Sequence, residues 1–220
     1  RIHDPAKPHV LDGFMAFTDY LGVPSSQPEW DLLVTEADLT VVREYLDPHR
    51  KNLLISPCSS KKEKDWLVER YAAVANWAHQ HDINVILCSS PAPRELAMIE
   101  EIKTLCNFEF VDVAGKLSLT QLTALIREVD LVISPDSGPA HIATTQGTPV
   151  IGLYAYHNPL RTGPYNNLDN VVSVYEQNAQ KEYGKPSAQL PWATKLKGQN
   201  LMAEIEVEEV VKQMEDLLLP

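Results

Sequence analysis

Short apolar runs alternate with amphipathic segments over most of the chain. The apolar run at residues 52–57, for example, precedes a segment whose apolar side chains recur at helical spacing. The alternation predicts strands at residues 52–57, 83–90, 108–113, 130–135, 148–155 and 170–175, and helices at residues 64–81, 93–106, 119–129 and about 137–146. A polar stretch at residues 176–200 interrupts the pattern before a terminal amphipathic helix at residues 203–219.

Residues that start and stop helices agree with this alternation. Pro93 stands in the first turn of its predicted helix, Ser118 is a good N-cap, and Gly147 follows the end of another helix. Strands with little internal alternation, separated by helices, are typical of a parallel sheet covered on both faces. We therefore expect an α/β fold with a doubly wound parallel sheet from about residue 50 onward.

The first fifty residues follow a different pattern. Residues 10–21 carry apolar side chains at helical spacing, and Gly22 follows them as a stop. A second short helix is predicted at residues 36–46, and residues 1–9 resemble a connector. Because the chain begins at Arg1, we expect it to be the C-terminal part of something longer.

Composition restricts the class of protein. A net charge of −11 and a pI near 5.0 argue against a general nucleic-acid or anionic-membrane surface, which needs clustered Lys and Arg. Cys58, Cys88 and Cys106 form no CxxC pair and are interpreted as reduced thiols in a cytosolic protein. No apolar stretch approaches the roughly 18 residues of a membrane span.

The turn after residues 130–135 carries the most chemistry. If a helix begins at about Ser137, the amides of Ser137, Gly138 and Ala140 lack partners within it and favour an anion such as phosphate. Pro139 has no amide to leave unpaired there, and His141 follows in the first turn. Asp136 suits sugar hydroxyls better than phosphate. The alternative, equally open, is that Asp136 is only an N-cap and His141 only a packed side chain.

Three other strand ends also carry polar or basic residues. After residues 52–57, Ser59 and Ser60 offer hydroxyls and amides, and Lys64 offers a cation for a diphosphate, although this stretch is no Walker A loop. Taken on its own, this stretch favours a solvated, Lys-rich loop. Glu95, after residues 83–90, suits ribose hydroxyls or an adenine amino group, or simply favours the helix dipole. Leu117 is either an apolar wall under a base or a core residue.

Taken together in this order, the motifs resemble glycosyltransferase family nine, the ADP-heptose:lipopolysaccharide heptosyltransferases. The stretch from Asp136 to Tyr165, "DSGPAHIATTQGTPVIGLYAYHNPLRTGPY", resembles the family's D-[ST]-G-x-x-H-x-A motif and its P-x-R-x-G-P-Y loop. "ISPCSSKKEKDW" resembles the P-G-A-S-x-x-x-K-x-W segment. The resemblance covers roughly residues 50–165.

The resemblance implies one half of a GT-B glycosyltransferase, a Rossmann-like domain that binds a nucleotide-sugar donor. It predicts a connector with helices at residues 1–48, following an N-terminal acceptor domain, and a donor-binding domain with its C-terminal helix at residues 49–220. By position, Ser59, Ser60 and Lys64 would contact the donor diphosphate, and Ser137, Gly138, Pro139 and His141 would hold phosphate from the opposite side. Asp136 would position the sugar, while Glu95 and Leu117 would flank the nucleoside.

The chemistry implied is transfer of a heptose or related sugar, with inversion, from an ADP-sugar to a lipopolysaccharide inner-core acceptor or another lipid-linked glycan. Lys64 would stabilise the departing diphosphate and Asp136 would assist, while the general base is expected in the N-terminal half. No tightly bound metal is expected, since the sequence has no Asp-x-Asp motif. The resemblance further implies a cytoplasmic protein with at most peripheral contact to the inner membrane face, and no nucleic-acid partner.

Two positions depart from the family pattern, and the second lies in a strand-end loop where discrimination between donors or acceptors is expected. Cys58 replaces a usual glycine, and Ala155-Tyr156-His157-Asn158 replaces the Gly-Pro-Thr-Asp of many members. Two other functions stay open on the same architecture. One is a different sugar-nucleotide enzyme such as an epimerase, which would act without an acceptor, and the other is a non-catalytic nucleotide-binding module.

Overall fold

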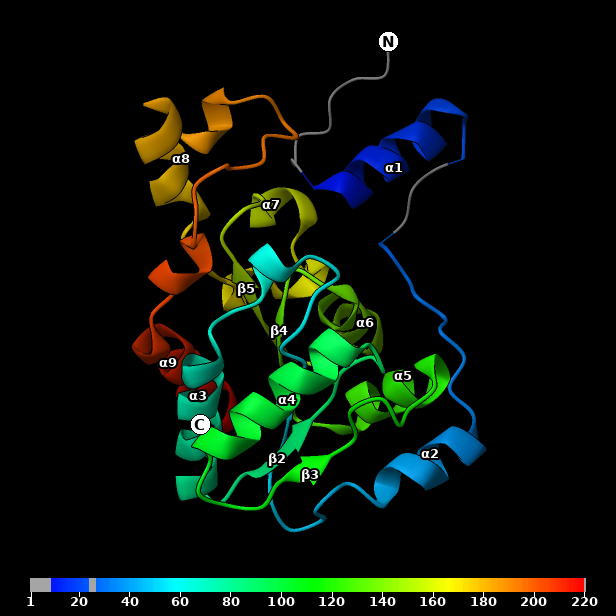
Figure 1. Cartoon of the computed structure of the whole chain (residues 1–220). Coiled ribbons are helices and arrows are strands. Elements are labelled where there is room, and N and C mark those ends of the chain that lie inside the picture. The colour runs from blue at the N-terminus through cyan, green and yellow to red at the C-terminus, as the bar shows by residue number, and fades with distance from the viewer. Residues whose placement is uncertain (1–8, 24–26, 220) are drawn as a thin grey trace.

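A six-stranded parallel sheet forms the centre of the protein. The computed structural model describes residues 9–23 and 27–219, and Figure 1 shows helices on both faces of the sheet. The strand order is β3-β2-β1-β4-β5-β6, and every neighbouring pair is parallel. The strands are β1 (Asn52–Ile55), β2 (Asn84–Leu87), β3 (Val111–Asp112), β4 (Leu131–Pro135), β5 (Val150–Tyr154) and β6 (Val172–Ser173).

The central strands are apolar because both of their faces are buried. In β1, Leu53 and Ile55 face one hydrophobic core and Leu54 faces the other, and all three are fully buried. A strand covered on both sides needs no polar positions, which explains the absence of internal alternation in the sequence.

Each face of the sheet is covered by its own set of helices. One core contains buried side chains of α3 (Val68–Gln80), α4 (Pro93–Leu105) and α9 (Val207–Leu218). The other contains those of α2 (Glu36–Arg43), α5 (Leu119–Glu128) and α6 (Gly138–Gln146). The predicted Rossmann-like, doubly wound parallel sheet is therefore confirmed.

Local helix signals are confirmed as well. Ser118 caps α5 in a capping box with Gln121, and Gly147 ends α6 in the left-handed region at φ +74°. The left-handed conformation at Gly147 explains why glycine stands there.

Other element boundaries differ from the prediction. The helix predicted at residues 64–81 begins only at Val68, and Lys64 lies in a preceding 3₁₀ turn, η1 (Lys62–Lys64). The polar stretch at residues 176–200 contains an unpredicted helix, α8 (Tyr175–Tyr183). The remaining short elements are α7 (Pro159–Thr162), η2 (Tyr165–Asn170), η3 (Ser187–Gln189) and η4 (Leu201–Glu204).

The N-terminal helix α1 (Val10–Tyr20) exists as predicted but buries none of its side chains. Its Phe14 and Phe17 are exposed, whereas Leu39 and Val42 of α2 are buried in the core of the domain. The proposed division at residues 48/49 stays a prediction, and the connector's residues 1–8 and 24–26 lie outside the described residues.

Gly152 offers a test of how tightly β5 is packed. A Cβ at this position would lie 2.9 Å from Cε2 of Tyr154, a ring that is itself buried. We expect Gly152→Ala to lower the free energy of unfolding by about 1–3 kcal/mol, because neither group has room to move. The measurement is urea unfolding.

The matched control is Gly13→Ala in α1, where a Cβ meets nothing within 4 Å. It should leave stability unchanged or raise it by up to about 1 kcal/mol, since alanine favours the helix. Equal effects of the two variants would contradict the tight packing at Gly152.

Candidate functional site

A largely buried carboxylate joins the ends of three neighbouring strands. Asp136 follows β4 directly, and its Oδ2 lies 2.6 Å from Lys64 Nζ and 2.7 Å from His157 Nδ1. Lys64 belongs to the turn after β1, and His157 to the loop after β5. Because β1, β4 and β5 are adjacent and parallel, their carboxyl ends meet at one edge of the sheet.

This carboxylate is held in its ionised form. The side chains of Asp136 and Lys64 are 13% and 14% exposed. Burial raises the pKa of Asp136, but the hydrogen bonds from His157 and Lys64 outweigh it, and the net pKa lies below the ordinary value of 3.8. With Asp136 ionised, Nδ1 of His157 is the donor in their contact, which fixes where that imidazole carries a proton.

The start of α6 lies directly beside this cluster. Ser137 is the N-cap, but its side chain makes no capping bond, and its hydroxyl instead pairs with Ser134 Oγ at 2.8 Å. Gly138 has open space where a Cβ would stand, and Pro139 occupies the first turn. With no side-chain cap, the first amides of the helix are left for another acceptor, and an anion suits them.

His141 completes the group from the first turn of α6. Its surface is open to solvent, yet desolvation by the surrounding protein lowers its pKa below 6.5. The charge of Asp136 acts in the opposite direction, while His9 and Lys64 lower the pKa further. His141 is therefore mainly neutral near pH 7, and a bound anion would favour its protonated form.

A second cluster lies in the loop after β1 and at the start of α4. The amide of Ser59 donates to Asp65 Oδ1 at 2.6 Å, and its hydroxyl donates to the carbonyl of Lys61 at 2.8 Å. Arg94 bonds both Asp65 and the carbonyl of Ser59. Burial raises the pKa of Asp65 despite these bonds. In this structure, both hydrogen-bond donors of Ser59 are therefore used by contacts within its own loop.

The other predicted residues are placed less decisively. Glu95 is 16% exposed, accepts from the amide of Ser90 at 3.0 Å and lies 3.6 Å from Arg94. Leu117 is half-buried against the core on the α5 side, and Ser60 is exposed. The structure thus groups Lys64, Asp136, Ser137, Gly138 and His141 closely. The roles assigned to all the predicted residues stay predictions.

Three residues of these clusters were not predicted to have a role: His157, Asp65 and Arg94. The loop containing His157 had been identified as a departure from the family pattern, and Arg94 directly precedes Glu95. No periodicity marks a loop residue as the partner of a carboxylate on another strand, so position at a strand end was the only available signal.

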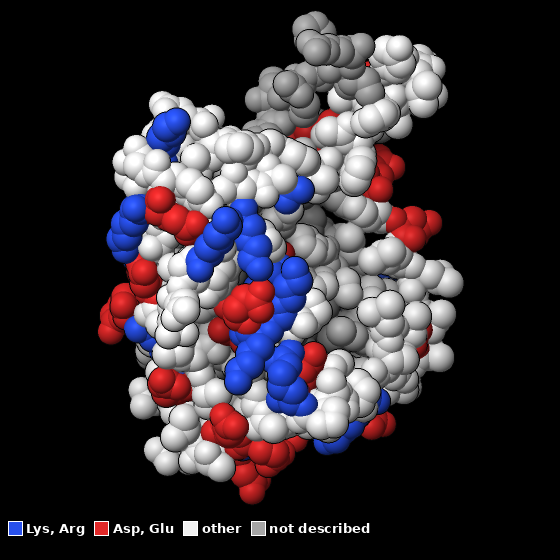
Figure 2. Space-filling view, turned by 45° about the horizontal axis from the view of Figure 1, so that its top comes forward, with Lys and Arg blue, Asp and Glu red and all other residues white. Residues whose placement is uncertain are grey.

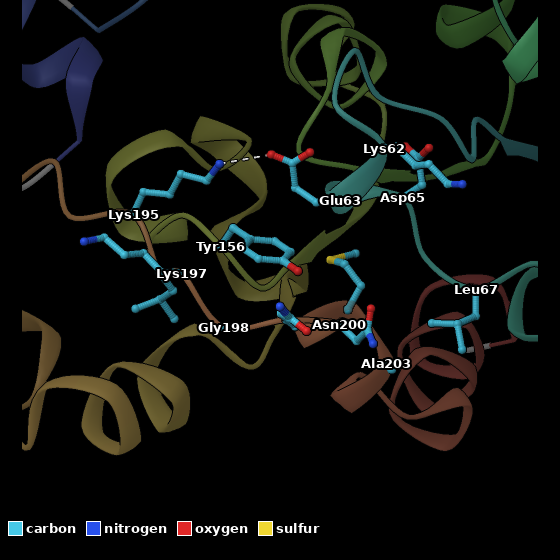
Figure 3. Close-up of a pocket in the computed structure, with 13 residues that line it drawn as sticks. Lys62, Glu63, Asp65, Leu67, Tyr156, Lys195, Lys197, Gly198, Asn200 and Ala203 are labelled. Carbon is cyan, nitrogen blue, oxygen red and sulfur yellow. Dashed lines mark hydrogen bonds and ion pairs between the residues drawn. The ribbon is translucent and has the colours of Figure 1, made fainter.

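A pocket among the described residues lies beside this site and not on it. Its volume is about 810 Å³, and none of the ten predicted residues lines it. Figure 3 shows Lys195 reaching across it to Glu63, at 3.0 Å, with Tyr156 nearby. The gap that touches Lys64, Asp136 and His157 is too narrow to hold a water molecule. We place the site by the charged cluster and not by pocket size, because chemistry needs the converging groups.

Charge on this edge contrasts with that of the whole chain. Figure 2 shows Lys and Arg side chains gathered around acidic ones in the middle of the face that carries the strand ends. The chain as a whole has a net charge of −11. Among the described residues, no helix is both long and apolar enough to cross a membrane.

The fold and this edge define a doubly wound α/β domain of the kind that binds ligands at the carboxyl ends of its strands. Residues 1–193 match the family described as glycosyltransferase family 9 (heptosyltransferase). The chain belongs to this family.

Curated relatives agree. The chain is 70% identical over 217 residues to the lipopolysaccharide core heptosyltransferase OpsX of Haemophilus influenzae, covering 99% of this chain and 62% of that protein. It is 27% identical to lipopolysaccharide heptosyltransferase 3 of Escherichia coli K12, covering 96% and 60%. The chain therefore spans about three fifths of the length of these relatives.

Solved structures share the fold. A family 9 glycosyltransferase from Veillonella parvula has a TM-score of 0.78 at 24% identity, covering 100% of this chain and 62% of its own. The E. coli heptosyltransferase WaaC with ADP has a TM-score of 0.65 at 18% identity, covering 97% and 58%.

The ionised state of Asp136 predicts an acid-dependent loss of stability. Because its folded pKa is lowered, its contribution is complete above the unfolded value of about 3.9 and is lost as pH falls through the lower folded pKa. The difference in unfolding free energy between the parent and Asp136→Asn should therefore shrink between pH 5 and pH 3, as measured by urea unfolding.

Asp31→Asn is the control, since Asp31 is exposed and makes no ion pair among the described residues. Its difference from the parent should be small throughout. If the difference in unfolding free energy between the parent and Asp136→Asn is the same at pH 5 and pH 3, the interpretation of Asp136 as an ionised, paired carboxylate is wrong.

Proposed function

We propose that this chain is the donor-binding part of a glycosyltransferase that moves a heptose, or a related sugar, from an ADP-sugar to a lipopolysaccharide inner-core acceptor. The observation that carries the proposal is Lys64 and the uncapped start of α6 on either side of Asp136. The naming of the 70% identical relative as a lipopolysaccharide core heptosyltransferase supports the substrate class. Because the chain spans only part of such relatives, the activity of the whole protein is part of the proposal.

In this proposal, the diphosphate of the donor lies between Lys64 and the first amides of α6. As the bond to the anomeric carbon breaks with inversion, negative charge grows on the diphosphate. The ammonium of Lys64, once it has engaged the bound diphosphate, and the fixed amides of α6 stabilise that charge. His141, on the same turn of α6, gains a proton or donates a hydrogen bond as the charge increases.

Asp136 has a different task, because a carboxylate repels phosphate. It is held by two donors and lies at the end of β4, and there it accepts from hydroxyl groups of the donor sugar. The general base that activates the acceptor is assigned to a part of the protein outside this domain. The proposed reaction needs no metal. The proposal also includes a cytoplasmic location with only peripheral contact to the membrane.

The first test is nucleotide binding by this chain. ADP should bind measurably in isothermal titration calorimetry, and Lys64→Ala and His141→Ala should each weaken it about 10- to 100-fold, because each removes a charged or polar donor. Lys212→Ala, an exposed residue of α9, is the control and should bind like the parent. Parent-like ADP binding by both site variants would place the site elsewhere.

The second test concerns transfer. This chain alone should bind the ADP-sugar but transfer nothing to an acceptor, since the general base is not expected within it. Product is followed by mass spectrometry with donor and lipopolysaccharide acceptor present. Robust transfer by this chain alone contradicts the division of labour, and epimerised donor without acceptor favours the alternative class of sugar-nucleotide enzyme.

A further inference from the structure

We propose that His157 is a positioning residue that keeps Asp136 paired while Lys64 is engaged by the donor diphosphate. The inference rests on the proposed function and deepens it. It concerns a residue of the loop that follows β5.

Both donors contact the same atom of Asp136. Lys64 Nζ lies 2.6 Å and His157 Nδ1 lies 2.7 Å from Oδ2. When a diphosphate arrives, the ammonium of Lys64 must share its charge with it or leave Asp136. The carboxylate is only 13% exposed, so water cannot readily replace the lost donor.

The two donors are anchored in different ways. Lys64 lies on a short 3₁₀ turn, η1, within a loop. His157 lies three residues after the end of β5, behind the buried Ala155 and Tyr156, and forms an antiparallel bridge with Lys195. The amide of Leu196 donates to the carbonyl of Tyr156 at 3.0 Å. The backbone of His157 is therefore held by the 195–196 segment, which is itself tied to η1 through the ion pair of Lys195 with Glu63 at 3.0 Å. The contact of His157 with Asp136 does not run through the Lys64 side chain, so it persists when that side chain turns to a diphosphate.

The consequence is a transfer of partners. With His157 present, Lys64 can turn to the diphosphate while Asp136 stays ionised, paired and aligned for the sugar. Without His157, Lys64 is the only remaining donor among the described contacts of Asp136. Binding a diphosphate then leaves a buried carboxylate without a donor, beside a second anion.

This predicts that two substitutions compensate each other. His157→Ala should weaken ADP binding about 10-fold or more, because Asp136 then competes with the nucleotide for Lys64. Adding Asp136→Asn should restore ADP affinity, because the competing charge is gone. His157→Asn should bind ADP nearly as well as the parent, since its amide nitrogen can take the place of Nδ1.

The experiment is calorimetric titration of ADP into the parent, His157→Ala, His157→Asn and the double variant Asp136→Asn/His157→Ala. His49→Ala is the matched control, because His49 is an exposed imidazole in the segment that precedes β1, at the opposite edge of the sheet. It should bind like the parent. The inference is overturned if His157→Ala binds ADP like the parent, or if the double variant stays as weak as His157→Ala.

A second measurement needs no nucleotide. Lys64→Ala and His157→Ala each leave Asp136 with one of the two donors described here. The double variant Lys64→Ala/His157→Ala leaves it with neither. The double variant should therefore lose more unfolding free energy than the sum of the two single variants. If the losses of unfolding free energy in the two single variants simply add, the shared role is contradicted, whatever the ADP titrations show. If the parent binds no ADP but this excess loss is found, the proposed function fails while the pairing of Asp136 stands.

Discussion

The site depends on one buried carboxylate that has to stay charged. Asp136 is 13% exposed and accepts from two side chains that come from other strand ends. Burial alone would neutralise it, because a charge in a poorly solvated place is costly. The two donors reverse that effect and at the same time tie the turn after β1 and the loop after β5 to the end of β4. The same two contacts that keep Asp136 charged thus also hold the loops at this edge of the sheet together.

The parallel sheet makes this compensation possible. Lys64 and Asp136 are 72 residues apart in sequence, yet they follow adjacent strands that run in the same direction. Trp66 adds a fixed point two residues beyond Lys64. Its ring is almost fully buried, and Nε1 donates to the carbonyl of Ile205 at 3.1 Å. The turn carrying Lys64 is therefore held between the sheet and the segment before α9, free enough to change partners but not to leave the site.

The central strands, their helices and several helix caps could be predicted from the sequence, because burial on both faces and capping are local signals. Residues at strand ends could be predicted for the same reason, since their position follows from the strands. His157 could not, because its partner is chosen by a loop conformation that no periodicity encodes. The helix α8 was missed because its exposed face is polar and only Tyr175, Asn178 and Ala179 are buried. Ser59 shows a further limit, since residue type does not reveal that in this structure the loop uses the donors of Ser59 for its own bonds.

Charge balance separates the two clusters by the ligand groups they suit. Around Asp136, the single carboxylate faces Lys64, His157 and the uncapped amides of α6, so that adding a dianion completes the site. Around Arg94, one guanidinium faces two carboxylates, Asp65 and Glu95. A group with excess negative charge accepts hydrogen bonds from hydroxyl and amino groups and repels phosphate. In the proposed function, the diphosphate of a nucleotide lies toward Lys64 and the start of α6, and its nucleoside lies toward Glu95. A nucleotide sugar has a matching distribution of charge along its length, and this match supports the proposal that the two clusters belong to one site.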